Sequence, residues 1–106
     1  MATVTAMARD HDGLIWLGTE DGLVRFDGHR FIDVSLERGG QLPDTYVAAL
    51  LATPDGMYVA TRRALVHLDL GGTEEQRVEV DGTDLAGVMA LAVGSDGAYL
   101  AATQQG

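Results

Sequence analysis

The sequence predicts an all-β fold, a partial β-propeller of about two and a half four-stranded antiparallel blades, from two observations. The first is an internal repeat: the segment from Trp16 to Asp27 recurs from Tyr58 to Asp69, 42 residues later, and a third copy begins before Thr103. The second is an Asp-Gly turn signal ahead of each copy. A fixed period of about 40 to 45 residues with four strands per period is the size of a propeller blade.

An apolar run that closes on Asp-Gly precedes each copy of the repeat. The runs begin at Val4, Val47 and Val88, and they end in the pairs Asp12-Gly13, Asp55-Gly56 and Asp96-Gly97. Asp-Gly between two apolar runs is typical of a hairpin, because Gly accepts the positive φ that a tight primed turn requires. We therefore expect one such hairpin in each unit.

The alternation of apolar and polar residues places four strands in each complete unit. They are expected at 5–8, 14–18, 23–26 and 31–34, and again at 48–51, 57–60, 65–68 and 77–80, with two strands in the third unit. The resulting blades cover 4–46, 47–87 and 88–106 of one partial propeller region, 1–106. No sustained helical period is present, so no helix is expected. A β-sandwich is the alternative, but a sandwich need not repeat its turn chemistry at a fixed spacing.

Composition excludes several classes of function. The chain of 106 residues is 46% hydrophobic and carries a formal charge of −9, which disfavours nucleic-acid binding because such binding rests on cationic contacts with phosphate. It has no cysteine, so disulfides and thiolate metal sites are excluded. Neither a signal peptide nor a run of about 18 apolar residues is visible, and no direct membrane insertion is expected.

Residues that suggest cation or phosphate binding have a simpler reading as turn residues. Asp10, Asp12 and Gly13 resemble the start of a calcium loop, but the later acidic ligands are missing, so a hairpin turn is expected. Gly18, Gly22 and Gly28 are interpreted as turn glycines, because no helix N-terminus follows them to bind phosphate.

The sequence contains no catalytic signature. Histidines 11, 29 and 67 lack the spacing of a metal pair, and His67 stands at the repeat position of Arg25, which suggests an exposed strand position with a solvated or hydrogen-bonded ring. No Ser has the context of a nucleophile elbow, and no carboxylate pair stands out. We therefore expect no catalytic residue, no metal site and no cofactor.

Aromatic and charged residues recur at related places in the units. Trp16, Tyr58 and Tyr99 would form a ligand-stacking set in one reading, but packing between blades is favoured, because aromatic rings supply large contact areas there. Ligand sites of propellers are expected at the mouth of the central channel, on loops. The first candidates for a binding surface are the turn residues Glu20, Asp21, Arg62 and Arg63.

Two segments, 4–31 and 42–69, resemble the two-component regulator propeller repeat, with its Asp-Gly, Leu-Trp-x-Gly-Thr, Gly-Leu and aromatic-Asp pattern. The first unit fits at Asp12, Gly13, Trp16, Gly18, Thr19, Gly22, Leu23 and Asp27. The second unit has Tyr58, Ala60 and Ala64 in place of the Trp and the two Gly, and the third has Leu100 and Ala102. These drifted copies weaken any expectation that the motif residues form a shared active site.

The resemblance implies a non-enzymatic segment of a sensory, ligand-binding propeller, periplasmic or extracytoplasmic, that binds an unknown small molecule or glycan. Its expected partners are the remaining blades of a larger parent protein or other copies of itself, because 103–106 break off where the repeat pattern would continue. A self-assembling scaffold or lectin-like oligomer is one alternative. A fragment of a lyase-like catalytic propeller is the other, and it would need a His and acidic cluster that the sequence does not show.

Overall fold

The computed structural model describes residues 3–34, 46–71 and 75–103, and the elements defined in these ranges are all β-strands. Within the same ranges, no helix combines the length and the apolar content needed to cross a membrane. The all-β prediction is confirmed, and each strand expected from the sequence overlaps an observed one.

Three antiparallel sheets follow one another along the chain. The first has the order β1 (Val4–Arg9), β2 (Ile15–Thr19), β3 (Gly22–Phe26) and β4 (Phe31–Asp33). The second has the order β5 (Val47–Thr53), β6 (Gly56–Thr61), β7 (Leu65–Asp69) and β8 (Glu75–Arg77). The third consists of β11 (Val88–Val93) and β12 (Tyr99–Thr103). These sheets are consecutive blades of a β-propeller.

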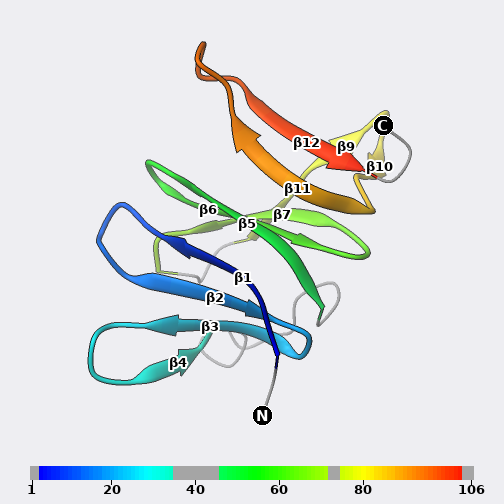
Figure 1. Ribbon diagram of the computed structural model, residues 1–106. Coiled ribbons are helices and arrows are strands. Elements are labelled where there is room, and N and C mark those ends of the chain that lie inside the picture. The colour runs from blue at the N-terminus through cyan, green and yellow to red at the C-terminus, as the bar shows by residue number, and fades with distance from the viewer. Residues whose placement is uncertain (1–2, 35–45, 72–74, 104–106) are drawn as a thin grey trace.

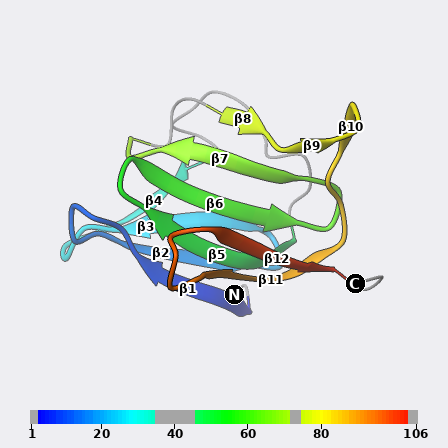
Figure 2. The same ribbon diagram turned by 90° about the horizontal axis from the view of Figure 1, so that it is seen from above.

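The blades stack face to face, with the first strand of each sheet innermost. Strand β5 contacts both β1 and β11, and Figures 1 and 2 show these three strands side by side while β4 and β8 lie farther out. Residues opposite one another in a sheet share a face, so the register of each sheet fixes which side chains meet the next blade. This arrangement builds the core between blades rather than within one.

The larger core cluster lies between the first and second blades. Trp16 and Leu23 of the first blade are fully buried against an apolar face of the second, formed by Met57, Val59, Val66 and Leu68. A second cluster between the second and third blades contains Ala49, Ala60, Leu65 and Val88. The burial of Trp16 confirms that this aromatic residue packs between blades.

Gly18 is not a turn glycine, contrary to the sequence interpretation. It lies inside β2, where a Cβ atom would stand 2.5 Å from Cγ1 of Val47 in the next blade. Gly28, by contrast, has φ +98° in the turn between β3 and β4, as expected, while Gly22, with φ +144°, is the first residue of β3 and directly follows the two-residue turn of Glu20 and Asp21. The first Gly of the repeat therefore allows close approach of two blades.

The Asp-Gly pairs form hairpins, but the tight primed turn predicted for all three is wrong. In the first blade Asp10 N–H donates to Leu14 at 2.9 Å and Gly13 has φ +89°, which is a three-residue loop. The third blade repeats this turn, with Gly97 at φ +85°. In the second blade Thr53 pairs with Gly56, so the turn consists of Pro54 and Asp55 and Gly56 belongs to the strand.

Another Asp-Gly pair forms the primed turn. Asp81 and Gly82 have φ values of +54° and +78°, and they join β9 (Glu79–Val80) to β10 (Thr83–Asp84) in a two-residue hairpin. The strand predicted at 77–80 is therefore divided: residues up to Val78 bond to β7, and Glu79 pairs with β10 instead. The chain leaves the second blade through this hairpin.

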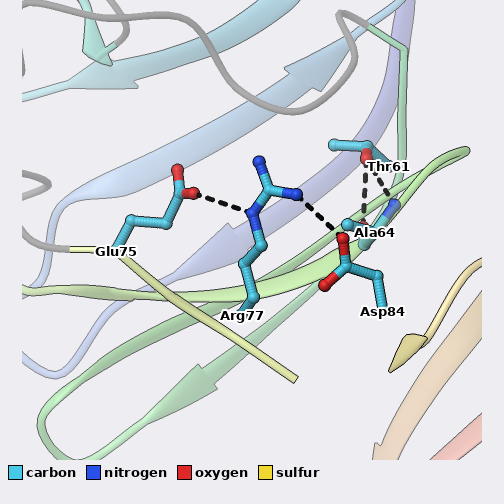
Figure 3. Close-up of polar contacts among 5 residues, drawn as sticks. All are labelled: Thr61, Ala64, Glu75, Arg77 and Asp84. Atoms are coloured by element: carbon cyan, nitrogen blue, oxygen red, sulfur yellow. Dashed lines mark hydrogen bonds and ion pairs between the residues drawn. The ribbon is translucent and has the colours of Figure 1, made fainter. Parts of the chain in front are cut away.

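Arg77 connects the outer strand of the second blade to this hairpin. Its Nη1 lies 2.8 Å from Oδ2 of Asp84 and its Nε lies 3.6 Å from Oε2 of Glu75, as Figure 3 shows. The hydrogen bond to Asp84 is the main cause of a raised pKa for Arg77, although the Arg77 side chain itself is 46% exposed. The ion pairs therefore orient the connector more than they stabilise the fold.

The contact between Gly18 and Val47 yields a test of blade packing. Gly18→Ala should lower the free energy of unfolding by about 1–3 kcal/mol, because the new methyl group overpacks the interface. Val47→Ala in the same chain should restore part of this loss, since it removes the clashing Cγ1. Urea denaturation of the two single variants and the double variant measures the coupling; strictly additive effects would contradict the proposed contact.

Candidate functional site

An equivalent irregularity interrupts the innermost strand of every blade. The register shifts between Val4 and Ala6, between Val47 and Ala49, and between Val88 and Ala90. The extra residues at these bulges are Thr5, Ala48 and Met89. Bulges redirect side chains and are frequent beside functional sites. Because β1, β5 and β11 are neighbours, the three bulges gather at one end of the blade stack.

A cavity opens at this end, and we call it the channel-mouth cavity. Its volume is about 730 Å³, within the range of small-molecule sites, and all three bulge residues line it. Its lining residues are Thr5, Tyr46, Ala48, Arg62, Gly87, Val88 and Met89. All three blades contribute, so the cavity exists only when the blades are stacked.

Two equivalent turns project at the same end of the stack. Thr19 Oγ1 donates to Gly22 O at 3.0 Å, and Thr61 Oγ1 donates to Ala64 O at 3.0 Å (Figure 3). In both turns the threonine hydroxyl also accepts a backbone N–H, from Asp21 or from Ala64. Each turn is therefore fixed by one threonine, whatever its two central residues are.

The four predicted binding residues occupy these central positions. Glu20 and Asp21 form the tip of the first turn, Arg62 and Arg63 form the tip of the second, and all four are exposed. Only Arg62 lines the channel-mouth cavity. The structure therefore places the four residues at one end of the blade stack but brings only one of them into a cavity. Their role in binding stays a prediction.

Arg62 is held from two sides. Its Cζ lies 5.0 Å from the centroid of the Tyr46 ring, a cation–π distance, and its carbonyl oxygen accepts the Gly87 N–H at 3.3 Å. Tyr46 precedes β5 and Gly87 precedes β11, so both come from segments that lead into innermost strands. Gly87 has φ +73°, a conformation that favours glycine.

The wall opposite Arg62 is mostly apolar. Ala48, Val88 and Met89 supply methyl and thioether groups, and 56% of the Met89 surface is exposed. Thr5 contributes a hydroxyl group, but that hydroxyl donates a hydrogen bond to the Val47 carbonyl and so joins the first two innermost strands. The cavity thus combines one guanidinium and two aromatic or hydroxyl groups with an apolar wall.

Asp10 has a structural role in the first hairpin, which confirms the turn interpretation of this residue. Its Oδ1 accepts the N–H groups of Asp12 and Leu14 at 2.9 and 3.0 Å, and its Oδ2 accepts the indole N–H of Trp16 at 2.7 Å. The Arg25 guanidinium lies 5.5 Å from the Trp16 ring and donates to Leu70 O of the next blade. The three hydrogen bonds satisfy the buried carboxylate of Asp10 within the first blade, and Arg25 links this blade to the second.

Replacing Asp10 tests this structural role. Asp10→Ala should lower the free energy of unfolding by about 1–3 kcal/mol, because it leaves the buried Trp16 indole N–H without its acceptor. Asp12→Ala, in the same turn but exposed, should change stability by less than about 0.5 kcal/mol. Fluorescence of Trp16, the single tryptophan, follows both unfolding curves; equal curves would argue against a structural role for Asp10.

His67 is not at an exposed position, contrary to the sequence expectation. It faces the third blade, and only 18% of its side chain is exposed. Its Nε2 lies 2.9 Å from Thr53 Oγ1 and 3.4 Å from Asp55 Oδ1, while Tyr58 packs on its ring at 4.9 Å. The repeat position shared with Arg25 is therefore an inter-blade position in both blades.

The region around His67 also contains a cavity of about 330 Å³, lined in part by Tyr58 and Tyr99. These two rings meet at 5.2 Å across the second interface, whereas Trp16 lies in the first, so the three aromatics do not form one stacking surface. In the first interface, Arg25 stands at the repeat position of His67, and its guanidinium donates to the carbonyl of Leu70, which directly follows β7 of the second blade. Within the described residues the third blade has two strands, so we interpret this cavity as part of the blade interface.

No metal site emerges from the described parts of the chain. In residues 3–34, 46–71 and 75–103, no three His, Cys, Asp or Glu side chains form a group that would hold a metal ion.

Sequence reasoning missed most residues of the channel-mouth cavity. Tyr46 and Gly87 stand just before repeat units and match no repeat motif. The signal for the bulge residues was present, because each follows the first Val of an apolar run at Val4, Val47 or Val88. A bulge, however, depends on pairing with the second strand, and one strand read alone does not reveal it.

Comparison with known proteins agrees with the fold and the repeat. A family model described as "Two component regulator propeller" matches residues 2–21. The extracellular domain of a hybrid two-component system, BT3049 from B. thetaiotaomicron, has a similar structure with a TM-score of 0.76 at 20% sequence identity. The match covers 94% of this chain and 16% of that chain. None of the curated proteins matches the chain.

Proposed function

We propose that the chain is a non-enzymatic segment of a sensory propeller and that it binds a small ligand in the channel-mouth cavity; the match of residues 2–21 to the family model supports the sensory role. The observation that carries this proposal is the convergence of the bulge residues Thr5, Ala48 and Met89 on one cavity. A ligand there contacts three blades at once, so binding would tighten their stacking. Such coupling is how a bound ligand would bias a larger propeller.

The proposed location is extracytoplasmic. The support is the structural similarity to an extracellular domain of a two-component system, together with the matched family description. The chain spans 16% of that similar chain, so the output of the whole protein, its ligand and its partners are also proposals. Partner blades in a larger parent protein would complete the ring around the same channel.

A binding screen tests the ligand-binding function. The ¹H–¹⁵N NMR spectrum of the chain would be recorded with mixtures of sugars, carboxylates, amines and nucleosides. We expect shifts at Arg62, Gly87 and Met89 and none at Gly13 or Gly97, which lie in hairpins at the other end of the blades.

Filling the cavity supplies the matched control. Ala48→Phe places a ring in the channel-mouth cavity and should abolish the shifts, whereas Ala98→Phe, at an exposed hairpin position, should leave them unchanged. Persistent binding to a folded Ala48→Phe chain would refute this site.

A self-assembling scaffold is the second candidate, and the apolar faces at both ends of the stack favour it. Met7 in the first blade and Leu100 in the third are 68% and 58% exposed. Leu100 occupies the repeat position of Trp16, which is buried by the following blade. At each blade interface inside the chain, one face of a blade packs against the opposite face of the next. The open face of the first blade and the open face of the third are such a pair, so copies would stack head to tail.

Light scattering over a range of concentrations tests the scaffold function. Assembly through the open faces should give a defined oligomer, and Leu100→Asp should raise its dissociation constant by at least about tenfold, because it places a charge in an apolar contact. The exposed substitution Glu79→Ala is the control and should leave the mass unchanged. A monomer at every concentration would rule out the scaffold.

A further inference from the structure

We infer that the ligand of the channel-mouth cavity is a small molecule that carries a carboxylate on an apolar body. This inference rests on the proposed ligand-binding function and names the class of its ligand. It depends on three features of the cavity: an oriented guanidinium, an apolar wall, and a basic turn on an otherwise acidic chain.

The guanidinium of Arg62 is the first feature. It presents N–H donors in a planar fork that matches the two oxygens of a carboxylate, and it can add such a contact to its others. The Tyr46 ring lies 5.0 Å from Cζ and restricts the guanidinium by a cation–π contact, and the Gly87 N–H donates to the backbone carbonyl of the same residue. A pre-oriented fork loses less side-chain entropy on binding an anion.

The apolar wall is the second feature. Ala48, Val88 and Met89 face the space that Arg62 borders, and they offer no charged group. Methionine adapts to apolar ligands of varied shape, because its side chain is unbranched and polarizable. A carboxylate with no apolar body would leave this wall in contact with water, whereas an alkyl or aryl body would bury it.

The charge of the turn is the third feature. The chain has 7 Lys and Arg residues against 16 Asp and Glu, and two of those basic residues are adjacent at Arg62 and Arg63. The equivalent turn of the first blade carries Glu20 and Asp21 and is also held by a threonine hydroxyl that donates to a backbone carbonyl. The second turn therefore carries two basic residues where the first carries two acidic ones, which favours an anionic ligand at the second turn over the first.

Three linear probes of six carbon atoms each separate the head group from the apolar body: hexanoate, hexanol and hexylammonium. NMR titration of the full chain at pH 7 and low salt should show that hexanoate binds at Arg62, Gly87 and Met89. Hexanol should bind about tenfold more weakly, because it lacks the charge-assisted hydrogen bonds. Hexylammonium should leave these signals unmoved.

Variants of the basic residue complete the test. Arg62→Gln should weaken hexanoate binding about tenfold, and Arg62→Lys, which keeps the charge but loses the planar fork, should weaken it less. Arg30→Gln removes the same charge from an exposed turn at the other end of the first blade and should change affinity by less than about twofold. The melting curve of each variant shows whether its fold is retained.

The outcomes separate the two proposals. Equal binding of hexanol and hexanoate, or unchanged hexanoate binding in folded Arg62→Gln and Arg62→Lys chains, would overturn the carboxylate inference and leave a ligand site in place. If a neutral ligand from the screen binds at these residues and hexanoate does not, the carboxylate inference is likewise overturned and the ligand site remains. If neither the screen nor the probes shift the cavity residues, the proposed ligand-binding function falls as well.

Discussion

The packing of neighbouring blades around Val47 determines the geometry on which the rest of the molecule depends. Val47 is fully buried, its Cγ1 lies where a side chain on Gly18 would stand, and its carbonyl accepts the hydroxyl of Thr5. One residue at the start of β5 thus fixes both the spacing and the offset of the first two blades. Because the same residue precedes the bulge at Ala48, inter-blade packing also positions the channel-mouth cavity.

The two blade interfaces use the same positions with different chemistry. In the first, Asp10, Trp16 and Arg25 are buried and linked by hydrogen bonding and a cation–π contact. In the second, Thr53, Tyr58 and His67 stand at the matching places and make smaller contacts. In both interfaces an aromatic side chain of the second strand contacts a nitrogen-containing side chain of the third strand, Trp16 with Arg25 and Tyr58 with His67. The blade geometry therefore determines which positions meet at an interface, while the contacts that form there depend on which residues occupy those positions.

The fold was predictable because its signals are local and repeated. Alternating strands and the recurrence of Trp16 to Asp27 at Tyr58 to Asp69 indicate blades without any knowledge of contacts. Turn geometry was predicted less well, because Asp-Gly is compatible with several loops. Gly56 belongs to a strand, while Asp81 and Gly82 form the primed turn. The register of the flanking strands decides between these outcomes, and a dipeptide does not encode register.

Packing of Trp16 between blades was predicted correctly, but two other positions that face another blade, Gly18 and His67, were not. His67 was expected to be exposed, since strand alternation alone does not say that both faces of a blade are covered. Gly18 was interpreted as a turn residue, although its function is to admit Val47. The repeat pattern indicated Arg62 and Arg63 as candidate binding residues. Tyr46 and Gly87 were not indicated, because their place at the site depends on tertiary contacts with Arg62.

Stability and ligand chemistry occupy different parts of this repeat. The side chains that hold the blades together point between the sheets, as Trp16 and Val47 do. At the channel mouth, Thr5, Ala48 and Met89 are bulge residues and Arg62 lies at the tip of the turn held by Thr61, as Thr19 holds the equivalent turn of the first blade. Since these threonines bond to main-chain atoms, the two central residues of each turn can be acidic or basic without loss of the turn. The turn tips can therefore differ in charge from blade to blade, as Arg62 at the cavity and Glu20 outside it do, while the stacking that forms the cavity is preserved.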